Sequence, residues 1–223
     1  MMDKAMFQTK ICGITSAEDA LVVARAGAQA IGLNFYARSS RYVTARAAGD
    51  ILKVLPAGIS KVGLFVDTPA ADICRLFDRL QLDLIQLHGD QPPEFLPQLG
   101  SRPVMRAFRV GPEGLRPVRE YLDRCHELRK DLALVLIDSL VVGEYGGTGT
   151  VANWSVAQAY QAENGMPPLV LAGGLTPENV AAAIRTVGPA AVDVASGVES
   201  RPGHKDPARV EAFLQAARIA FGR

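Results

Sequence analysis

The stretch Phe7-Gln-Thr-Lys-Ile-Cys-Gly-Ile-Thr-Ser-Ala-Glu-Asp-Ala-Leu-Val-Val-Ala-Arg-Ala26 contains the unit from which the rest of the chain is built. Its first six residues predict a short strand that ends at Cys12, with a glycine directly after it. The hydroxyl-bearing pair Thr15-Ser16 then precedes two acidic residues, a pattern typical of a helix N-terminus, so a helix is expected over 16–26. A short apolar run followed by an amphipathic stretch recurs along the whole sequence.

This alternation predicts eight strands and eight helices. The strands are expected near 7–12, 29–35, 59–66, 83–87, 103–109, 132–138, 168–172 and 190–195. The helices are expected near 16–26, 44–55, 69–80, 92–98, 113–130, 153–163, 177–187 and 206–221. Two of the later helices carry their own start signals. Thr176-Pro177-Glu178 places a proline at a first helical position, and Lys205-Asp206-Pro207 opens the last helix.

Eight strand–helix units within 223 residues favour an α/β fold, a single-domain (β/α)8 barrel over residues 1–223. An open doubly wound sheet is the alternative, because periodicity alone does not show that a sheet closes. No Ser/Gly-rich linker divides the chain. In such a barrel the functional groups lie at the C-terminal ends of the strands and in the loops that follow, so the residues at these positions are the candidates for chemistry.

Composition excludes several classes of partner. Hydrophobic residues make up 48% and charged residues 21%, and the net charge is +1 with no basic stripe, so neither nucleic acid nor a membrane surface is expected to bind. No apolar run approaches the roughly 18 residues of a membrane span, and no signal-peptide pattern precedes the first strand. The three cysteines are widely separated and lack metal-ligand spacing, which predicts a reducing, cytoplasmic setting and no metal site.

Cys12 is the first candidate for catalysis. It ends a strand, and Lys10 lies two residues earlier and therefore on the same face. A nearby ammonium would lower the pKa of the thiol toward neutrality and favour the thiolate. The alternative is a small buried hydrophobic residue, as for most free cysteines. Cys74 and Cys125 lie within amphipathic helical stretches, where that structural interpretation is preferred.

Asp138 ends the apolar run Leu132-Ala-Leu-Val-Leu-Ile-Asp138 in the same manner. Desolvation raises a carboxyl pKa, which a general acid at neutral pH requires. A loop or helix cap is the plainer alternative. The glycine-rich segment that follows, Tyr145-Gly-Gly-Thr-Gly149, suits either a lid over a substrate or a solvated connection. A thiol base and a carboxyl acid at two strand ends indicate proton transfer without metal or cofactor.

Two later strand ends carry glycines. Gly173-Gly174 follows the seventh strand, and Ser196-Gly197 follows the eighth. Loops after strands seven and eight often bind phosphate in these barrels, since glycines let backbone N–H groups approach an anion. Glycines in tight turns are common, but glycines at both of these positions favour a phosphate site.

Four further polar residues have both functional and structural interpretations. Gln86 and His88 share a strand face, and His88 is more readily a packed, hydrogen-bonded histidine than a base. Asp193 on strand eight would pair with Lys10 if both face inward, because burying either charge alone is costly. Arg41, in the loop after strand two, suits bidentate binding of a carboxylate but equally a solvated loop.

The chain resembles the phosphoribosylanthranilate isomerases of tryptophan biosynthesis along nearly its whole length. The matching stretches are Lys10-Ile-Cys-Gly-Ile14, Phe35-Tyr36, Ser40-Arg-Tyr-Val43, Val62-Gly-Leu-Phe-Val66, Ile85-Gln-Leu-His-Gly89, Asp138-Ser139, Gly146-Gly-Thr-Gly149, Leu171-Ala-Gly-Gly-Leu175, Asp193-Val-Ala-Ser-Gly-Val-Glu199 and Lys205-Asp206-Pro207. Each is modest evidence alone, whereas their order and spacing together are highly specific.

The resemblance implies an Amadori rearrangement of the phosphosugar N-(5-phosphoribosyl)anthranilate to 1-(2-carboxyphenylamino)-1-deoxyribulose 5-phosphate, with no cofactor. Asp138 would then be the general acid and Cys12 the general base. The backbone around Gly173-Gly174 and Ser196-Gly197 would hold the phosphate. Arg41 would face the anthranilate carboxylate.

Two other functions remain as alternatives. The histidine-pathway isomerase performs the same rearrangement on the same scaffold, but its relatives usually carry an aspartate base where this chain has Cys12. A noncatalytic barrel that binds a phosphometabolite would keep the glycine loops without needing Cys12 and Asp138 together. Either a monomer or a homodimer fits the sequence.

Overall fold

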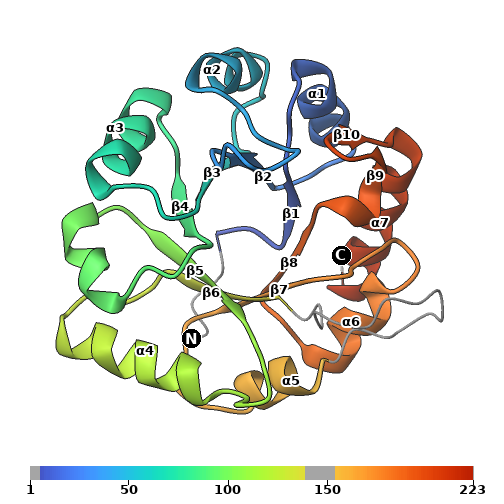
Figure 1. The fold of residues 1–223 in the computed structure, drawn as a ribbon. Coiled ribbons are helices and arrows are strands. Elements are labelled where there is room, and N and C mark those ends of the chain that lie inside the picture. Colours follow the sequence, from blue (N-terminus) through green and yellow to red (C-terminus); the bar gives the residue numbers. More distant parts are fainter. Residues whose placement is uncertain (1–5, 139–153, 223) are drawn as a thin grey trace.

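The computed structural model describes residues 6–138 and 154–222. Eight parallel strands pair in sequence order, and the last pairs with the first, so the sheet closes into a barrel (Figure 1). They are β1 (Thr9–Cys12), β2 (Ala30–Asn34), β3 (Ser60–Phe65), β4 (Leu84–Leu87), β5 (Val104–Arg109), β6 (Leu134–Asp138), β7 (Leu169–Ala172) and β8 (Ala191–Val194). Closure confirms the predicted (β/α)8 barrel and excludes the open sheet.

Helices surround the barrel as an outer layer (Figure 1). They are α1 (Ala17–Arg25), α2 (Ala45–Lys53), α3 (Ala70–Leu80), α4 (Arg116–Glu127), α5 (Ser155–Gln161), α6 (Val180–Val187) and α7 (Pro207–Ala220). The helix predicted near 92–98 is instead the 3-10 helix η1 (Pro93–Leu99). Pro97 lies inside it and has no N–H to donate, which disfavours regular α-helical bonding there. No described helix combines the length and the apolar character that a membrane span requires.

Two predicted helix starts are confirmed. The side chain of Ser16 caps α1 by accepting a hydrogen bond from the backbone N–H of Asp19 at 3.0 Å. Asp206 caps α7 in the same way, with Pro207 as the first helical residue. Such caps satisfy backbone donors that the first turn of a helix leaves without partners.

The start predicted for the helix near 177–187, which is α6, is wrong. α6 begins at Val180, and Pro177 lies in the preceding turn. The side chain of Asn179 accepts a hydrogen bond from the N–H of Thr176 at 2.8 Å and donates to the carbonyl of Gly174 at 2.9 Å. These bonds fold residues 174–179 into a turn, so the helix starts three residues later than proline alone suggests.

Strand residues alternate between two apolar clusters, one inside the barrel and one beneath the helices. The inner cluster includes Ala30, Val62, Leu84, Met105, Ala107, Leu134, Leu136, Val170, Ala172 and Ala191. The outer cluster includes Ile11, Ile31, Leu33, Ile85, Leu87, Phe108, Val135, Ile137, Leu169, Leu171, Val192 and Val194. Since successive strand residues point to opposite faces, these two lists fix which polar residues face the barrel axis.

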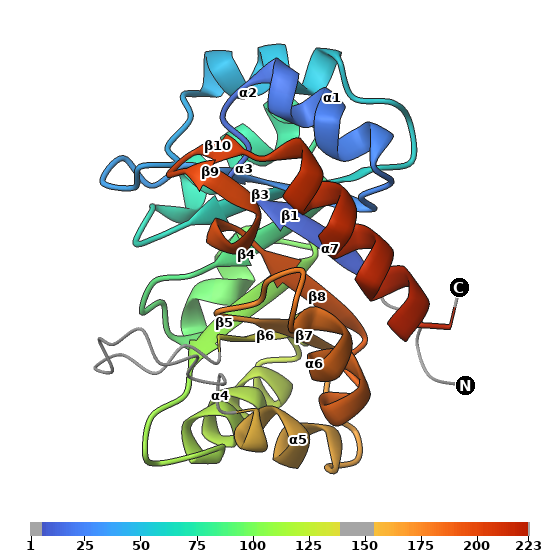
Figure 2. The same ribbon diagram turned by 90° about the vertical axis from the view of Figure 1, so that its right-hand side faces the viewer.

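After β8 the chain forms a short 3-10 helix, η2 (Ser196–Val198), and then a hairpin of β9 (Glu199–Arg201) and β10 (His204–Lys205). In Figure 2 the hairpin lies beyond the end toward which the arrows of β1 and β8 point. The sequence pattern does not predict this hairpin, because strands of three and two residues are too short for periodicity to detect. It lies at the rim of the barrel, beside the C-terminal end of β1 (Figure 1).

Candidate active site

Cys12 is the last residue of β1 and is 7% exposed. Its neighbour Ile11 belongs to the outer cluster, so Cys12 and Lys10 both face the barrel interior, as predicted. Gly32 on the paired strand β2 provides the space they need. A Cβ atom at Gly32 would lie 2.7 Å from the Sγ atom of Cys12 and 3.0 Å from the Nζ atom of Lys10. Sequence reasoning missed this glycine, whose only signal is an inward position without a side chain.

Lys10 and Asp193 form a buried ion pair, which confirms the predicted contact. The Nζ atom of Lys10 donates to both carboxylate oxygens of Asp193 at 3.0 Å, and the two residues are register partners in β1 and β8. Burial alone would lower the pKa of Lys10, but Asp193 and Cys12 together outweigh it and the net shift is upward. Lys10 is therefore a charged lysine inside the barrel.

The pKa of the Cys12 thiol is raised, mainly by burial, and Lys10 offsets only part of that effect. The prediction that Lys10 brings this pKa toward neutrality is therefore wrong. The physical reason is the second partner of Lys10, because Asp193 neutralises the ammonium and itself disfavours a thiolate. Burial inside the barrel therefore favours the protonated thiol of Cys12.

Asp138 is the last residue of β6 and is half-buried. Leu136 lies in the inner cluster and Ile137 in the outer one, so the alternation turns Asp138 toward the barrel axis. β6 and β1 are separated by β7 and β8 around the closed sheet. Asp138 and Cys12 therefore face the interior from different walls at the same C-terminal end of the barrel, which is the arrangement that the sequence predicts.

Arg109 lies beside Asp138 and was not among the residues that sequence reasoning singles out. The two are register partners at the ends of β5 and β6. Arg109 shares the inward phase of Met105 and Ala107, and its side chain is exposed. The inward phase of the fifth strand is the signal that identifies it. A guanidinium next to the candidate acid adds positive charge to this wall of the barrel.

Gln86 and His88 share the inward face of β4 and the residue that follows it, as predicted. Gln86 is 1% exposed, and its Nε2 atom lies 3.5 Å from the Nδ1 atom of His88. Burial, together with the charge of Arg109, lowers the pKa of His88 to about 4. A neutral, largely buried imidazole with a polar neighbour supports the packed histidine rather than the catalytic base.

The two glycine-bearing loops lie against each other at the barrel rim. Gly173 and Gly174 have φ angles of +89° and +62°, a backbone conformation that favours glycine. A Cβ atom at Gly197 would overlap the carbonyl oxygen of Leu175, so the loop after β8 touches the loop after β7 there. Ser196 and Gly197 begin η2. The predicted phosphate-binding residues are thus brought together in space.

Arg41 forms a bidentate ion pair with a carboxylate, but this carboxylate is that of Glu199 in the protein itself. Its Nε and Nη2 atoms donate to Glu199 at 2.8 and 2.6 Å. The Arg41 side chain packs against Gly13, the residue directly after Cys12. Glu199 also accepts a hydrogen bond from Lys205 at 2.8 Å. Glu199 and Lys205 lie in stretches that match the family, but the sequence pattern gives neither residue a role in the site.

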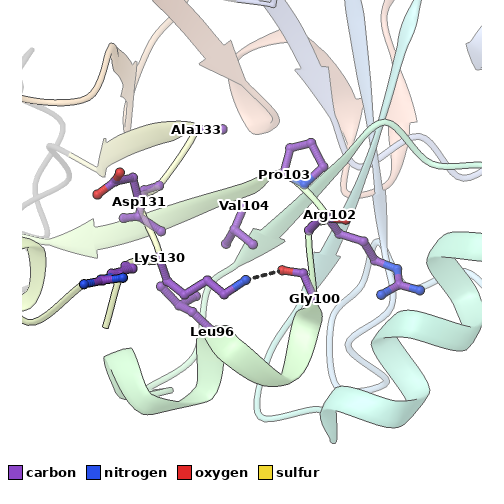
Figure 3. Close-up of a pocket in the computed structure, with 11 residues that line it drawn as sticks. Leu96, Gly100, Arg102, Pro103, Val104, Lys130, Asp131 and Ala133 are labelled. Carbon is purple, nitrogen blue, oxygen red and sulfur yellow. Dashed lines mark hydrogen bonds between the residues drawn. The ribbon is translucent and has the colours of Figure 1, made fainter. Parts of the chain in front are cut away.

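The possible lid, Tyr145–Gly149, lies outside the described residues. A cavity of about 400 Å³ lies at the opposite end of the barrel, where β5 and β6 begin (Figure 3). Its lining includes Lys130, whose ammonium donates to the carbonyl of Gly100 at 2.8 Å. The cavity contains none of the candidate site residues, which gather at the C-terminal ends of the strands.

Comparison with known proteins agrees with this geometry. Residues 9–216 match the family model described as N-(5'-phosphoribosyl)anthranilate (PRA) isomerase. The N-(5'-phosphoribosyl)anthranilate isomerase of Geobacter sulfurreducens is 48% identical over 214 residues, covering 96% of this chain and 99% of that protein. The enzyme of the same name from Azotobacter vinelandii is 44% identical over 217 residues, covering 97% of this chain and 100% of that protein.

Solved structures give the same result. Phosphoribosyl anthranilate isomerase from Thermotoga maritima superposes with a TM-score of 0.81 at 38% identity, covering 96% of this chain and 99% of that one. A structure of a phosphoribosyl anthranilate isomerase in complex with reduced 1-(o-carboxyphenylamino)-1-deoxyribulose 5-phosphate superposes with a TM-score of 0.79 at 36% identity, with the same coverage. A third, at 35% identity and a TM-score of 0.77, covers 95% and 98% and describes monomers generated from a dimeric Thermotoga maritima enzyme. This chain therefore belongs to the N-(5'-phosphoribosyl)anthranilate isomerase family.

Proposed function

We propose that this protein catalyses the Amadori rearrangement of N-(5-phosphoribosyl)anthranilate to 1-(2-carboxyphenylamino)-1-deoxyribulose 5-phosphate in tryptophan biosynthesis, without a cofactor. Family membership over residues 9–216 supports the substrate. The observation that carries the mechanism is the placement of a thiol, Cys12, and a carboxyl group, Asp138, at strand ends that face one interior. These are the two groups that an acid–base isomerisation requires.

Asp138 is proposed as the general acid of the first step. It transfers its proton to the furanose ring oxygen, and the bond between that oxygen and C1 breaks. The ring oxygen becomes a hydroxyl group, and the nitrogen lone pair forms a protonated imine with C1. Arg109, the register partner of Asp138, lies beside the carboxylate that this step leaves behind.

Cys12 is proposed as the general base of the second step. Its thiolate removes the proton from C2, and the electron pair forms the C1–C2 double bond of an enolamine. Loss of the proton on the C2 oxygen and protonation of C1 then give the ketone. Burial raises the pKa of Cys12, so the thiolate needs further stabilisation. The positive charge of the protonated imine supplies it at the stage when the base is required.

The remaining groups of the substrate are proposed to bind at the rim. Backbone N–H groups around Gly173-Gly174 and Ser196-Gly197 hold the phosphate, since their loops meet and their glycines allow close approach. Arg41 faces the anthranilate carboxylate. Its bond to Glu199 already orients the guanidinium beside Gly13, which reduces the ordering that binding would otherwise require.

The wider setting follows from the same residues. We propose one domain over residues 1–223, acting as a monomer or as a homodimer, with the dimeric Thermotoga maritima relative supporting the latter. A cytoplasmic location is proposed because all three cysteines are free thiols.

The deciding experiment is isomerisation of phosphoribosylanthranilate by the purified protein, followed by loss of anthranilate fluorescence. Turnover is expected for the wild type and for Cys125→Ser, a matched control whose thiol is buried on α4. Absence of turnover by the wild type would overturn the proposed function.

A further inference from the structure

Lys205 is a fully buried lysine at the end of β10. Its Nζ atom donates three hydrogen bonds, to the carbonyl oxygen of Cys12 at 2.6 Å, to that of Ala195 at 3.2 Å and to the Oε1 atom of Glu199 at 2.8 Å. An ammonium group has three N–H donors, so each one has a partner here. One cation thus joins the end of β1, the residue after β8 and the hairpin.

Packing alone does not explain a charge at this place. Burying an ion pair costs more desolvation than its attraction usually returns, and apolar residues of similar volume often stabilise a fold as well or better. The side chains of Lys205 and Glu199 are 0% and 3% exposed. Buried pairs kept at such cost are candidates for functional positions.

The backbone after Cys12 is held from two sides. The N–H groups of Gly13 and Ile14 both donate to the carbonyl oxygen of Gly32, at 2.9 and 3.0 Å. Lys205 holds the Cys12 carbonyl from the hairpin side. The position of the Cys12 thiol relative to the rim therefore depends on where Lys205 holds this turn. Misplacement of a catalytic group by about 1 Å can reduce a rate by about two orders of magnitude.

Five charged groups surround the Cys12 thiol. Lys10 on the same strand and Asp193 on β8 form one pair, while Lys205 on β10 and Arg41 in the loop after β2 share Glu199. The set holds three basic groups and two carboxylates, and burial lowers the pKa of Lys205 while its hydrogen bond to Glu199 offsets part of that effect. Within this set Lys205 lowers the pKa of Cys12, and Asp193 raises it.

We propose that Lys205 is a positioning residue for the isomerisation, which fixes the C-terminal end of β1 against the loop after β8 and so holds Cys12 as the base beside the phosphate site. The proposal rests on the proposed function. Lys205 does not touch the reacting atoms. It acts through its hydrogen bond to the backbone of Cys12 and by favouring the thiolate form of that residue.

The test compares Lys205→Met with Lys130→Met. Lys130 also donates to a backbone carbonyl, that of Gly100, but at the opposite end of the barrel. For Lys205→Met we expect kcat to fall about 10-fold or more while KM changes by less than about threefold, because positioning of the base affects the chemical step. Lys130→Met is expected to change neither parameter.

A second readout needs no substrate. The rate at which iodoacetamide modifies Cys12, followed by peptide mass spectrometry, reports the thiolate fraction at each pH. In Lys205→Met its midpoint should move to higher pH, since a cation is lost. In Glu199→Gln it should move to lower pH, since the carboxylate that neutralises Lys205 and Arg41 is lost. General loosening of the fold would not give shifts of opposite sign.

The outcomes separate this proposal from the proposed function. If the wild type isomerises its substrate but Lys205→Met moves neither kcat nor the Cys12 midpoint, the role of Lys205 is overturned. If Lys205→Met does not fold, the alkylation midpoint of Cys12 in Glu199→Gln decides. An unchanged midpoint in that variant would overturn the role of Lys205. If the wild type shows no turnover, the proposed function fails, while the alkylation midpoints still decide whether Lys205 controls Cys12.

Discussion

The Nζ atom of Lys10 lies 3.0 Å from both carboxylate oxygens of Asp193, inside the barrel and almost without solvent. These residues are 183 positions apart in the chain, and they meet because β8 pairs with β1. The pair spans the seam at which the barrel closes. An open sheet would place its first and last strands too far apart for this contact.

Removing one partner of this pair should be costly for stability. Lys10→Met leaves Asp193 buried without its counterion, and we expect it to lower the free energy of unfolding by about 3–5 kcal/mol. The double variant Lys10→Met/Asp193→Leu leaves neither buried charge without its partner and should be more stable than Lys10→Met. Urea unfolding of the wild type, both single variants and the double variant measures the coupling. Additive losses in the double variant would contradict the pairing.

Replacing either proposed proton-transfer group should slow catalysis without preventing binding. General acid–base groups typically contribute about 10²- to 10⁴-fold, so Cys12→Ser and Asp138→Asn should each lower kcat by that factor. Steady-state kinetics measures kcat, and titration with a product analogue measures binding. Near-normal kcat in either variant would remove that residue from its role. Cys125→Ser, a buried thiol on another element, is the matched control.

The strands could be predicted from the sequence because each is a short apolar run bounded by turn residues. All eight appear within a few residues of their predicted positions, from Thr9–Cys12 to Ala191–Val194. The misjudged segments depend on local hydrogen bonding that composition does not reveal. Asn179 builds the turn that delays α6, and Pro97 converts a predicted helix into a 3-10 helix.

The site was predictable where it lies at strand ends and less so elsewhere. Alternation places Cys12 and Asp138 on the inward face, which sequence reasoning anticipates. The pKa of Cys12 could not be predicted from Lys10 alone, because a neighbour's effect depends on its other partners. Glu199 and Lys205 belong to a hairpin whose strands are too short to show a pattern.

Arg41 offers a test of substrate binding. A charge-assisted hydrogen bond from Arg41 to the anthranilate carboxylate should be worth roughly 1.5–3 kcal/mol, so Arg41→Met should raise KM about 10- to 100-fold with a smaller effect on kcat. Arg38→Met is the control, since Arg38 is an exposed cation in the same loop. Equal changes in KM for both variants would indicate a general charge effect rather than a specific contact.

Gly174 tests the phosphate site. Its φ of +62° is strained for other residues, and a carboxylate there would repel the phosphate, so Gly174→Asp should raise KM at least about tenfold. Gly188→Asp is the matched control, because Gly188 has a φ of +65° and open space around it at the C-terminal end of α6. Gly188→Asp should lower the free energy of unfolding but leave KM unchanged. An unchanged KM in Gly174→Asp would argue against phosphate binding at this loop.

The lowered pKa of His88 should make the stability of the protein depend on pH. Burial lowers its pKa from 6.5 in the unfolded chain to about 4 in the folded protein. Between these values the unfolded chain binds the proton and the folded protein does not, so stability falls as pH decreases from 6.5 toward 4. The loss from this one residue should reach about 2 kcal/mol, because its partial exposure reduces the full effect.

In His88→Gln this contribution should disappear, so its free energy of unfolding should vary less over the same pH range. His126→Gln is the control, because His126 is an exposed histidine whose replacement removes no buried ring. Urea unfolding at several pH values measures the slope, and nuclear magnetic resonance follows the imidazole directly. A His88 signal that titrates near 6.5 in the folded protein would show that solvent and neighbouring carboxylates reach the ring, and the imidazole would again qualify as a base.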